Sequence, residues 1–252
     1  MLSRNTIAQS LLVYDDIVVF GGYNVRSKPH AHHALEIILS KDLSTTVTHQ
    51  GKRHTSRGLI LKADAVHETC TEGSALFIYF DPESSFARQF NYLFKGLQII
   101  VLSDEESRRI IEFVEKVMQE GSFESTIKEF LLRTLFVDHT VHTFNRVVDD
   151  RVLKSISFIQ QNIHRVVPMK ELTEAVCLSD SRLFHLFKTD IGIPIRRYIL
   201  WCRVRKALKL VVAGRNFTQA AETSGFADVA HLNRTFVKFF GVSPSHVLKN
   251  TL

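Results

Sequence analysis

Apolar residues recur at helical spacing near the end of the chain. Four of them fall three or four positions apart and form one stripe of a helix: Leu232, Phe236, Phe239 and Phe240. Asp228 stands before this stripe as an N-cap, and Gly241 ends it. Gly225 can adopt the left-handed conformation that a tight turn before the helix needs. Ser243 and Pro244 then have the order of cap and first helical residue that predicts another helix.

The same pattern occurs a second time upstream. Leu183, Phe187 and Gly192 are repeated 49 residues later as Leu232, Phe236 and Gly241. A repeat of this length predicts two copies of one supersecondary unit, here two helices joined by a turn. Between the copies, residues 195–211 carry apolar side chains at helical spacing with many Arg and Lys around them, which predicts one long amphipathic helix.

The spaced residues of 225–244 (Gly-Phe, a cap, Arg, Phe and Gly-x-Ser-Pro) resemble the C-terminal signature of the AraC/XylS family of bacterial transcription regulators. Ala230 stands where the family usually has Ser, and Leu232 where it usually has Phe. The resemblance covers about residues 150–250. It implies an all-α DNA-binding domain with two helix-turn-helix units, and a DNA-binding regulator, more often an activator that works with RNA polymerase. The alternative is a helical bundle in which the phenylalanines form only a core.

The resemblance also implies which side chains face the major groove of double-stranded DNA. In the first unit these are Ser181, Arg182, Phe184, His185 and Lys188. In the second unit they are Val229, His231, Asn233, Arg234 and Lys238. The family usually has a polar residue at the position of Phe184, which would contact a thymine methyl or pack on a neighbouring helix. Two recognition helices in one chain are expected to enter successive grooves about 34 Å apart.

The charge of the chain is divided unevenly. Residues 1–148 carry 16 Lys and Arg against 18 Asp and Glu, whereas residues 149–252 carry 16 against 8. The half with the repeated pattern is therefore basic by eight charges, which favours a polyanionic partner through counterion release. The odd number of scattered cysteines argues against a disulfide framework, and no signal peptide or spanning segment is evident, so we expect a cytoplasmic protein without a membrane partner. We interpret Cys177 as a buried structural thiol.

The first third of the chain has the pattern of short strands. Apolar or alternating runs are separated by turn residues at spacings of about 8–12 residues, and they occur at 17–20, 35–39, 44–49, 59–61 and 76–80. The first run is expected to end at Gly21 and Gly22, and Asp81-Pro82 closes the series. The pattern predicts a sandwich or small barrel, so that the whole chain is of the α+β class.

Histidines are concentrated in this region. The spacing of His30, His32 and Glu36 resembles the first cupin motif, and a segment ending in His67 resembles the second motif loosely, because the usual Pro and Gly are replaced by Lys62, Ala63 and Asp64. The resemblance implies a cupin-like barrel in which His30, His32, Glu36 and His67 line one mouth and bind a ligand. Three alternatives stay open: an organic effector, a divalent metal, or no small ligand at all. We assign no cofactor, and a cupin-type metalloenzyme with an accessory DNA-binding domain is the alternative to a regulator without enzymatic activity.

After a short helix expected at about 86–94, two longer helices are expected before the linker. Ser103 caps the first, with acidic residues in its first turn and Gly121 at its end, and Ser122 starts the second, which includes Phe136 and Val137. Their wide apolar faces either form a homodimer interface or pack on the chain's own barrel. We therefore predict a sensor domain at 1–98, a helical pair at 99–142, a linker at 143–150 and a DNA-binding domain at 151–252.

Overall fold

The computed structural model describes residues 11–41, 44–120, 123–135 and 147–248. The chain divides into two compact units. The first consists of Met1–Phe144 together with Val237–Leu252, and the second of Asn145–Phe236. The predicted residues 121–122 and 136–146, which include Phe136, Val137 and most of the linker, lie outside the described ranges.

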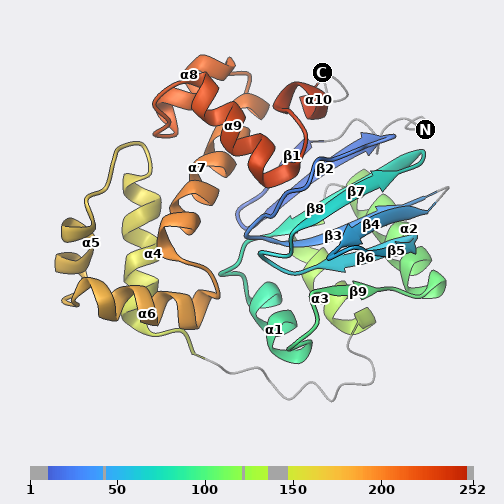
Figure 1. The fold of residues 1–252 in the computed structure, drawn as a ribbon, viewed down its shortest axis with the longest axis horizontal. Helices are drawn as coiled ribbons and strands as arrows, with labels where there is room; N and C mark the ends of the chain where they lie inside the picture. Colours follow the sequence, from blue (N-terminus) through green and yellow to red (C-terminus); the bar gives the residue numbers. More distant parts are fainter. Residues whose placement is uncertain (1–10, 42–43, 121–122, 136–146, 249–252) are drawn as a thin grey trace. The chain divides into compact units, whose positions relative to one another are not determined.

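The first unit is built on two antiparallel sheets (Figure 1). The larger has the strand order β1-β2-β8-β3-β6-β9, with bounds β1 Leu11–Val13, β2 Ile17–Tyr23, β3 Leu35–Ser40, β6 Gly58–Leu61, β8 Ser74–Phe80 and β9 Ile99–Val101. The smaller has the order β5-β4-β7, with bounds β4 Thr45–His49, β5 Lys52–Ser56 and β7 His67–Thr71. The predicted strand-rich region is therefore present, and its strands pair antiparallel.

One predicted strand end is wrong. The strand β2 continues through Gly21 and Gly22 to Tyr23, because both glycines pair with β8, opposite Leu76 and Ala75. A Cβ atom on Gly22 would lie 2.4 Å from Cγ2 of Val25, so the glycine serves a close approach inside a strand rather than a turn. The strands β1 and β2 form an antiparallel hairpin, and the turn between them contains Asp15 and Asp16.

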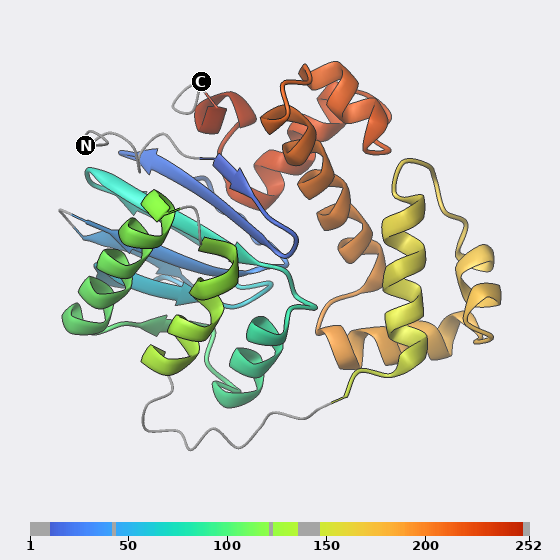
Figure 2. The same ribbon diagram turned by 180° about the vertical axis from the view of Figure 1, so that it is seen from behind.

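Three helices of the first unit pack on the large sheet: α1 (Ser85–Leu93), α2 (Asp104–Glu120) and α3 (Phe123–Leu135). Ser103 caps α2 as predicted, since its hydroxyl accepts from the backbone of Glu106 while the Glu106 carboxylate accepts from the backbone of Ser103. Figure 2 shows α2 and α3, in green, lying across the strands. Residues of both helices join one core with the sheet, among them Ile110, Val114 and Leu131. Packing within the chain thus covers part of their apolar faces.

The second unit is helical, as predicted. Its helices are α4 (Asp150–Asn162), α5 (Met169–Ala175), α6 (Asp180–Ile191), α7 (Ile195–Val212), α8 (Phe217–Thr223) and most of α9 (Val229–Phe240). The last turn of α9 and the short helix α10 (Pro244–Leu248) belong to the first unit. Trp201 and Tyr198 of α7 are fully buried and anchor the core of the second unit. In the described ranges, no helix has both the length and the hydropathy to span a bilayer.

Candidate nucleic-acid interface and buried histidine cluster

The two halves of the sequence repeat form two helix-turn-helix pairs, α5–α6 and α8–α9. Ser179 caps α6 by accepting from the backbone N–H of Arg182, and Asp228 caps α9 by accepting from the backbone N–H of His231. Both caps satisfy backbone donors at the helix end that would face DNA. Gly192 ends α6, and Gly241 follows the last residue of α9, each in the left-handed conformation. The predicted caps and stops are therefore confirmed at equivalent positions of the two copies.

The turn of the first pair contains a residue that sequence reasoning placed wrongly. Cys177 adopts a left-handed conformation with φ of 53°, as its position in the turn requires, but its side chain is exposed rather than buried. The prediction of a buried thiol at Cys177 is therefore wrong, and the described cysteines are all free.

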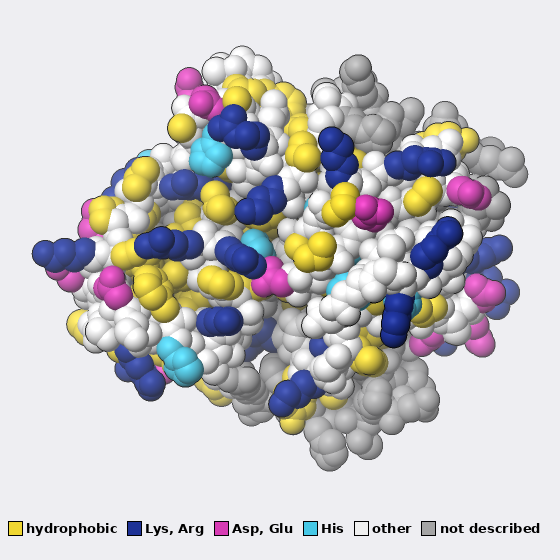
Figure 3. Space-filling view, in the orientation of Figure 1, with side chains coloured by type: hydrophobic (Ala, Val, Ile, Leu, Met, Phe, Trp, Pro, Cys, Tyr) yellow, Lys and Arg dark blue, Asp and Glu magenta, His cyan; other side chains and the backbone are white. Residues whose placement is uncertain are grey.

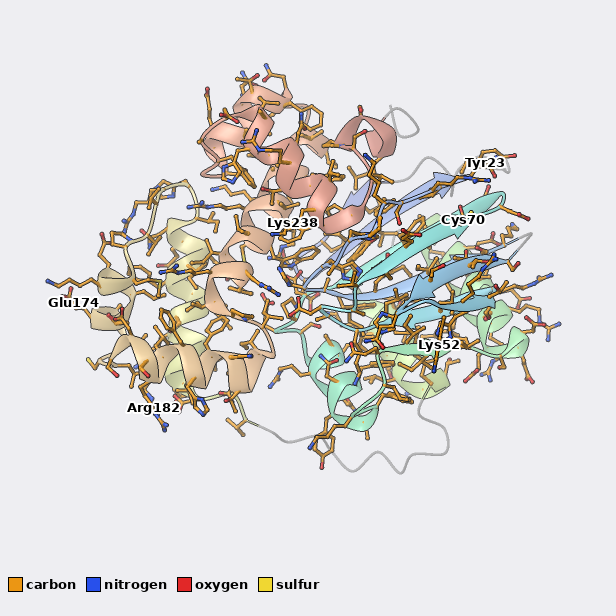
Figure 4. All side chains as sticks on the ribbon, viewed as in Figure 1. Tyr23, Lys52, Cys70, Glu174, Arg182 and Lys238 are labelled. Atoms are coloured by element: carbon orange, nitrogen blue, oxygen red, sulfur yellow. The ribbon has the colours of Figure 1, made fainter. Side chains whose placement is uncertain are left out.

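The polar face of α6 is open to solvent. The exposed side chains are those of Ser181, Arg182, His185 and Lys188, whereas Leu183 and Phe187 are buried beneath them. Arg182 projects away from the helix (Figure 4). The helix therefore presents hydroxyl, imidazole and cationic groups on one side, which are the groups that contact base edges and phosphates.

Phe184 is half-buried and is not a fully outward residue. It lines a surface pocket of about 230 Å³ together with Lys188 and the start of α7, at Pro194, Ile195 and Arg196. The ring thus lies beside the neighbouring helix while keeping part of its surface open. Sequence reasoning missed Arg196, whose exposed guanidinium stands at the rim of the same pocket.

In α9 the exposed residues are Ala230, Asn233, Arg234 and Lys238, and the whole predicted apolar stripe is buried. Val229 and His231 are half-buried, and the imidazole of His231 packs edge-on against Phe226 at 5.2 Å between ring centroids. The side chain of His231 therefore packs partly against the turn that precedes α9. Arg234 is exposed and is the only Lys or Arg of α9 that lies in the second unit.

The spacing between the two recognition helices is set by α7. Its 18 residues span about 27 Å at 1.5 Å per residue. A Cβ atom on Gly225 would lie 2.4 Å from the backbone oxygen of Ile163 and 3.0 Å from Nε of Arg203. The glycine therefore permits the close packing of the α8–α9 turn against α7 and the end of α4. Figure 3 shows Lys and Arg side chains recurring on the visible face of this helical unit.

The four predicted ligand residues come together in the first unit. His30 and His67 are joined by a pair of backbone hydrogen bonds, of 3.0 and 2.9 Å, which set their side chains opposite each other. His32 and Glu36 come from the approach to β3 and from β3 itself, with 2.9 Å between His32 Nε2 and Glu36 Oε2. One nitrogen of each imidazole lies within 4.8 Å of one nitrogen of the others. We call these four residues the histidine cluster.

The other nitrogen of each ring is held by the backbone. Nδ1 of His30 donates to the carbonyl of Lys28 at 2.9 Å, Nδ1 of His32 to that of Ala34 at 2.9 Å, and Nδ1 of His67 to that of Ala65 at 2.8 Å. A carbonyl oxygen can only accept, so each Nδ1 carries a proton. Nε2 is therefore the nitrogen that each ring directs toward the centre of the cluster.

Tyr79 is a member of the site that sequence reasoning missed. Its hydroxyl donates to Glu36 Oε1 at 2.5 Å, and the two residues are paired across β8 and β3. Both side chains are about 1% exposed. The only sequence signal was that both lie in apolar strands, because the pairing of two strands so far apart in sequence is not visible from the residues.

The electrostatics of the histidine cluster follow from burial and mutual contact. Burial would raise the pKa of Glu36, but the charges of His32 and His67 and the hydrogen bond with His32 outweigh it and hold that pKa well below its usual range. Burial and the charges of the two other rings lower the pKa of His30 to about 3. For His67 the contact with Glu36 outweighs burial and raises the pKa. Burial and the nearby carboxylate raise the pKa of Tyr79.

The donor set of the histidine cluster fits a transition metal. Three imidazole nitrogens and one carboxylate are the ligands that zinc and neighbouring divalent ions prefer. Nε2 of His67 is buried and makes no hydrogen bond, and it lies 3.4 Å from Glu36 Oε2. His33, which follows His32, lies outside the cluster because its ring pairs with Asp64 at 2.7 Å.

The comparisons with known proteins point to the helical half. A helix-turn-helix domain family matches residues 172–250. LumQ of Photobacterium leiognathi, described as a probable transcriptional regulator, is 23% identical over 153 residues, which cover 56% of this chain and 59% of LumQ. The transcriptional regulator AdiY of Escherichia coli is 25% identical over 123 residues, which cover 48% of this chain and 47% of AdiY. These two matches thus span about half of each relative.

The fold is shared over nearly the whole chain with ToxT of Vibrio cholerae. An apo form of ToxT superposes with a TM-score of 0.65 and 13% identity, covering 95% of this chain and 99% of ToxT. ToxT bound to an unsaturated fatty acid gives 0.61 and 15%, covering 95% and 97%. The predicted α+β architecture, strand-rich followed by helix-turn-helix, is therefore confirmed.

Proposed function

We propose that the chain is a sequence-specific DNA-binding transcription regulator of the AraC type, because residues 172–250 match a helix-turn-helix domain family. The observation that carries the proposal is the pair of capped helices, α6 and α9, each with a buried apolar stripe and an exposed polar face. Such a helix enters a major groove with its N-terminal residues near the base edges.

We assign different roles in DNA binding to the arginine and the lysine side chains. Arg182, His185 and Arg234 are exposed near the helix faces that would meet base edges, and Lys188 and Lys238 lie a turn further on. Bidentate arginine contacts to guanine discriminate between sequences, whereas lysine contacts to phosphate hold the register. The excess of eight positive charges in residues 149–252 supplies the general affinity for DNA.

The first unit is the proposed sensor of a small effector. ToxT, which shares the fold, has been crystallised with an unsaturated fatty acid and with a substituted naphthalenyl butenoic acid. In this chain the buried polar groups that would meet an effector are those of the histidine cluster and Tyr79. A coupling of about 1–3 kcal/mol between effector and DNA would suffice for regulation. A homodimer and an RNA polymerase contact belong to the proposal as partners.

A cupin-type metalloenzyme remains the second candidate, because the histidine cluster would suit a catalytic metal. The relatives of known type are transcriptional regulators, which favours the first proposal. The regulator is expected to bind one DNA sequence selectively, whereas the metalloenzyme is expected to turn over a substrate.

Fluorescence anisotropy with DNA from upstream of the chain's own gene and its neighbours tests the proposal. The regulator should prefer one fragment over a shuffled duplex of the same composition by at least about 10³-fold. Affinity should fall steeply as salt rises, with a slope set by the number of phosphate contacts. Equal weak binding to every duplex would overturn sequence-specific recognition and leave only the basic charge of the helical half.

A further inference from the structure

A surface pocket lies in the second unit, where the recognition helix α6 is followed by α7. Its volume is about 230 Å³, and the residues that line it are Phe184, Lys188, Pro194, Ile195 and Arg196. Pockets for drug-sized ligands have volumes of about 300–1,000 Å³. This pocket therefore suits a smaller molecule, of the size of one ring with a short side chain.

The floor of the pocket is apolar. Ile195 is buried, and Phe184 and Pro194 are half-buried, so part of their apolar surface stays open to water. The family that the sequence resembles usually has a polar residue at position 184, so the apolar floor is a feature of this chain's own sequence. A ligand with an apolar body gains free energy by removing this surface, and its own, from water.

Two cations stand at the rim of the pocket. Lys188 and Arg196 are exposed, and neither forms an ion pair with a carboxylate in the described part of the chain. The described ion pairs of the second unit engage Arg151, Arg165 and Lys170 instead. Among the described residues that line the pocket there is neither Asp nor Glu. The complement of this rim is therefore an anionic group.

We propose that this pocket binds a small amphipathic carboxylate and that the bound acid competes with DNA. The apolar body of the acid lies against Phe184, and its carboxylate lies between Lys188 and Arg196. Lys188 belongs to the polar face of α6, which the proposed function assigns to DNA, so the acid and a DNA phosphate claim the same cation. The competition rests on the proposed function, whereas binding of the acid is measured without DNA.

The test titrates the full chain in a calorimeter with benzoate, 3-phenylpropionate and octanoate at low salt. At least one of these acids should bind at one molecule per chain, with a Kd of about 1 mM or tighter. The alcohol with the same apolar body should bind at least about 10-fold more weakly, because it lacks the charge that both cations contact. Affinity for the acid should fall as salt rises.

Matched pairs of variants locate the bound acid. Arg196→Gln and Lys188→Gln should each weaken binding about 3- to 10-fold, because each removes one charged contact at an exposed rim. Arg215→Gln and Lys154→Gln remove the same kinds of charge from exposed positions outside the pocket and should leave binding unchanged. All four substitutions are at the surface, so the fold should be retained, and circular dichroism checks this.

Fluorescence anisotropy with a duplex measures the competition. The acid at ten times its Kd should lower the apparent affinity for DNA about 10-fold, because it occupies most of the free chain. The alcohol at the same concentration should have no effect. Sodium chloride keeps the ionic strength equal in all samples, since DNA binding itself depends on salt.

Two results would overturn the ligand site. One is that none of the three acids binds, and the other is that Arg196→Gln and Lys188→Gln leave binding undiminished, which would place the acid elsewhere. An unchanged affinity for DNA in the presence of bound acid would overturn the competition. A chain that binds an acid through these two cations but prefers no duplex would support the site and contradict the proposed function, so the two failures are told apart.

Discussion

The hydroxyl of Tyr79 donates to Glu36 Oε1 at 2.5 Å inside the core of the large sheet. Both side chains are about 1% exposed, so water cannot replace the bond. We expect Tyr79→Phe to lower the free energy of unfolding by about 1–3 kcal/mol, because a buried carboxylate oxygen loses a donor. Urea denaturation followed by circular dichroism measures this. Tyr23→Phe is the control, since that ring is 58% exposed and should change stability by less than about 0.5 kcal/mol.

A Tyr79→Phe variant as stable as the wild type would contradict this account of the site. It would mean that the carboxylate of Glu36 is satisfied by its histidine neighbours alone.

The glycines that follow the two recognition helices provide a matched pair. Gly192 and Gly241 both have positive φ, of 89° and 68°. A Cβ atom on Gly192 would meet nothing within 4 Å, whereas one on Gly241 would lie 2.6 Å from Nδ1 of His30 and 2.8 Å from the backbone oxygen of Lys28. We expect Gly192→Ala to cost about 1 kcal/mol for the left-handed backbone, and Gly241→Ala about 1–3 kcal/mol more.

Thermal or urea unfolding of the two variants side by side measures the difference. Equal losses would show that the loop of Lys28 and His30 does not pack against Gly241 in solution.

Lys62 gives a prediction for alkaline pH. Its buried ammonium donates to the backbone oxygens of Asn91 and Phe94 at the end of α1, and burial lowers its pKa from the ordinary 10.5. A base whose pKa is lowered on folding opposes folding while it is protonated. This penalty is lost as the pH rises from the folded pKa to 10.5. The stability of the wild type should therefore rise relative to Lys62→Met across that window.

Urea unfolding of both proteins at stepped alkaline pH tests the sign. Two parallel curves would mean that Lys62 is as well solvated in the folded chain as in the unfolded one.

Arg234 is the cation of α9 expected to read a base. Arg234→Ala should weaken binding to the cognate duplex by about 1–3 kcal/mol and relax the preference at one base position. Lys154→Ala removes the same charge from an exposed position of α4, outside the recognition helices, and should have a much smaller effect. If Arg234→Ala weakens binding equally on cognate and shuffled duplexes, the side chain contacts phosphate instead.

The helical half could be predicted closely because its signals are local. Caps such as Ser179 and Asp228, and stops such as Gly192, act within one turn of helix, and the repeat doubled the evidence for each. The strands β2, β3, β4, β6 and β8 could be predicted for the same reason, whereas the short apolar strands β1 and β9 were not predicted, and residues 99–101 had been assigned to the helical pair. The strands β5 and β7 were missed because their residues are largely polar, so that only pairing with β4 makes them strands.

Non-local contacts limited how much of the histidine cluster could be predicted from the sequence. The spacing of His30, His32 and Glu36 was visible in the chain, but the donor from Tyr79 depends on the pairing of β3 with β8. Lys62 was noted only as a departure from a motif, whereas the fold uses it to cap α1. Cys177 was misplaced because the direction of a side chain at a turn depends on its φ rather than on its hydropathy.

Selection of binding sites from a random pool of duplexes tests the central proposal most directly. The full chain is incubated with the pool at near-physiological salt, and the bound duplexes are sequenced over several rounds. Two capped recognition helices joined by α7 predict enrichment of two short motifs, centred about one helical turn apart on one face of the DNA. A pool that stays random while the chain is folded and binds duplexes would contradict the account and reduce the helical half to a non-specific basic surface.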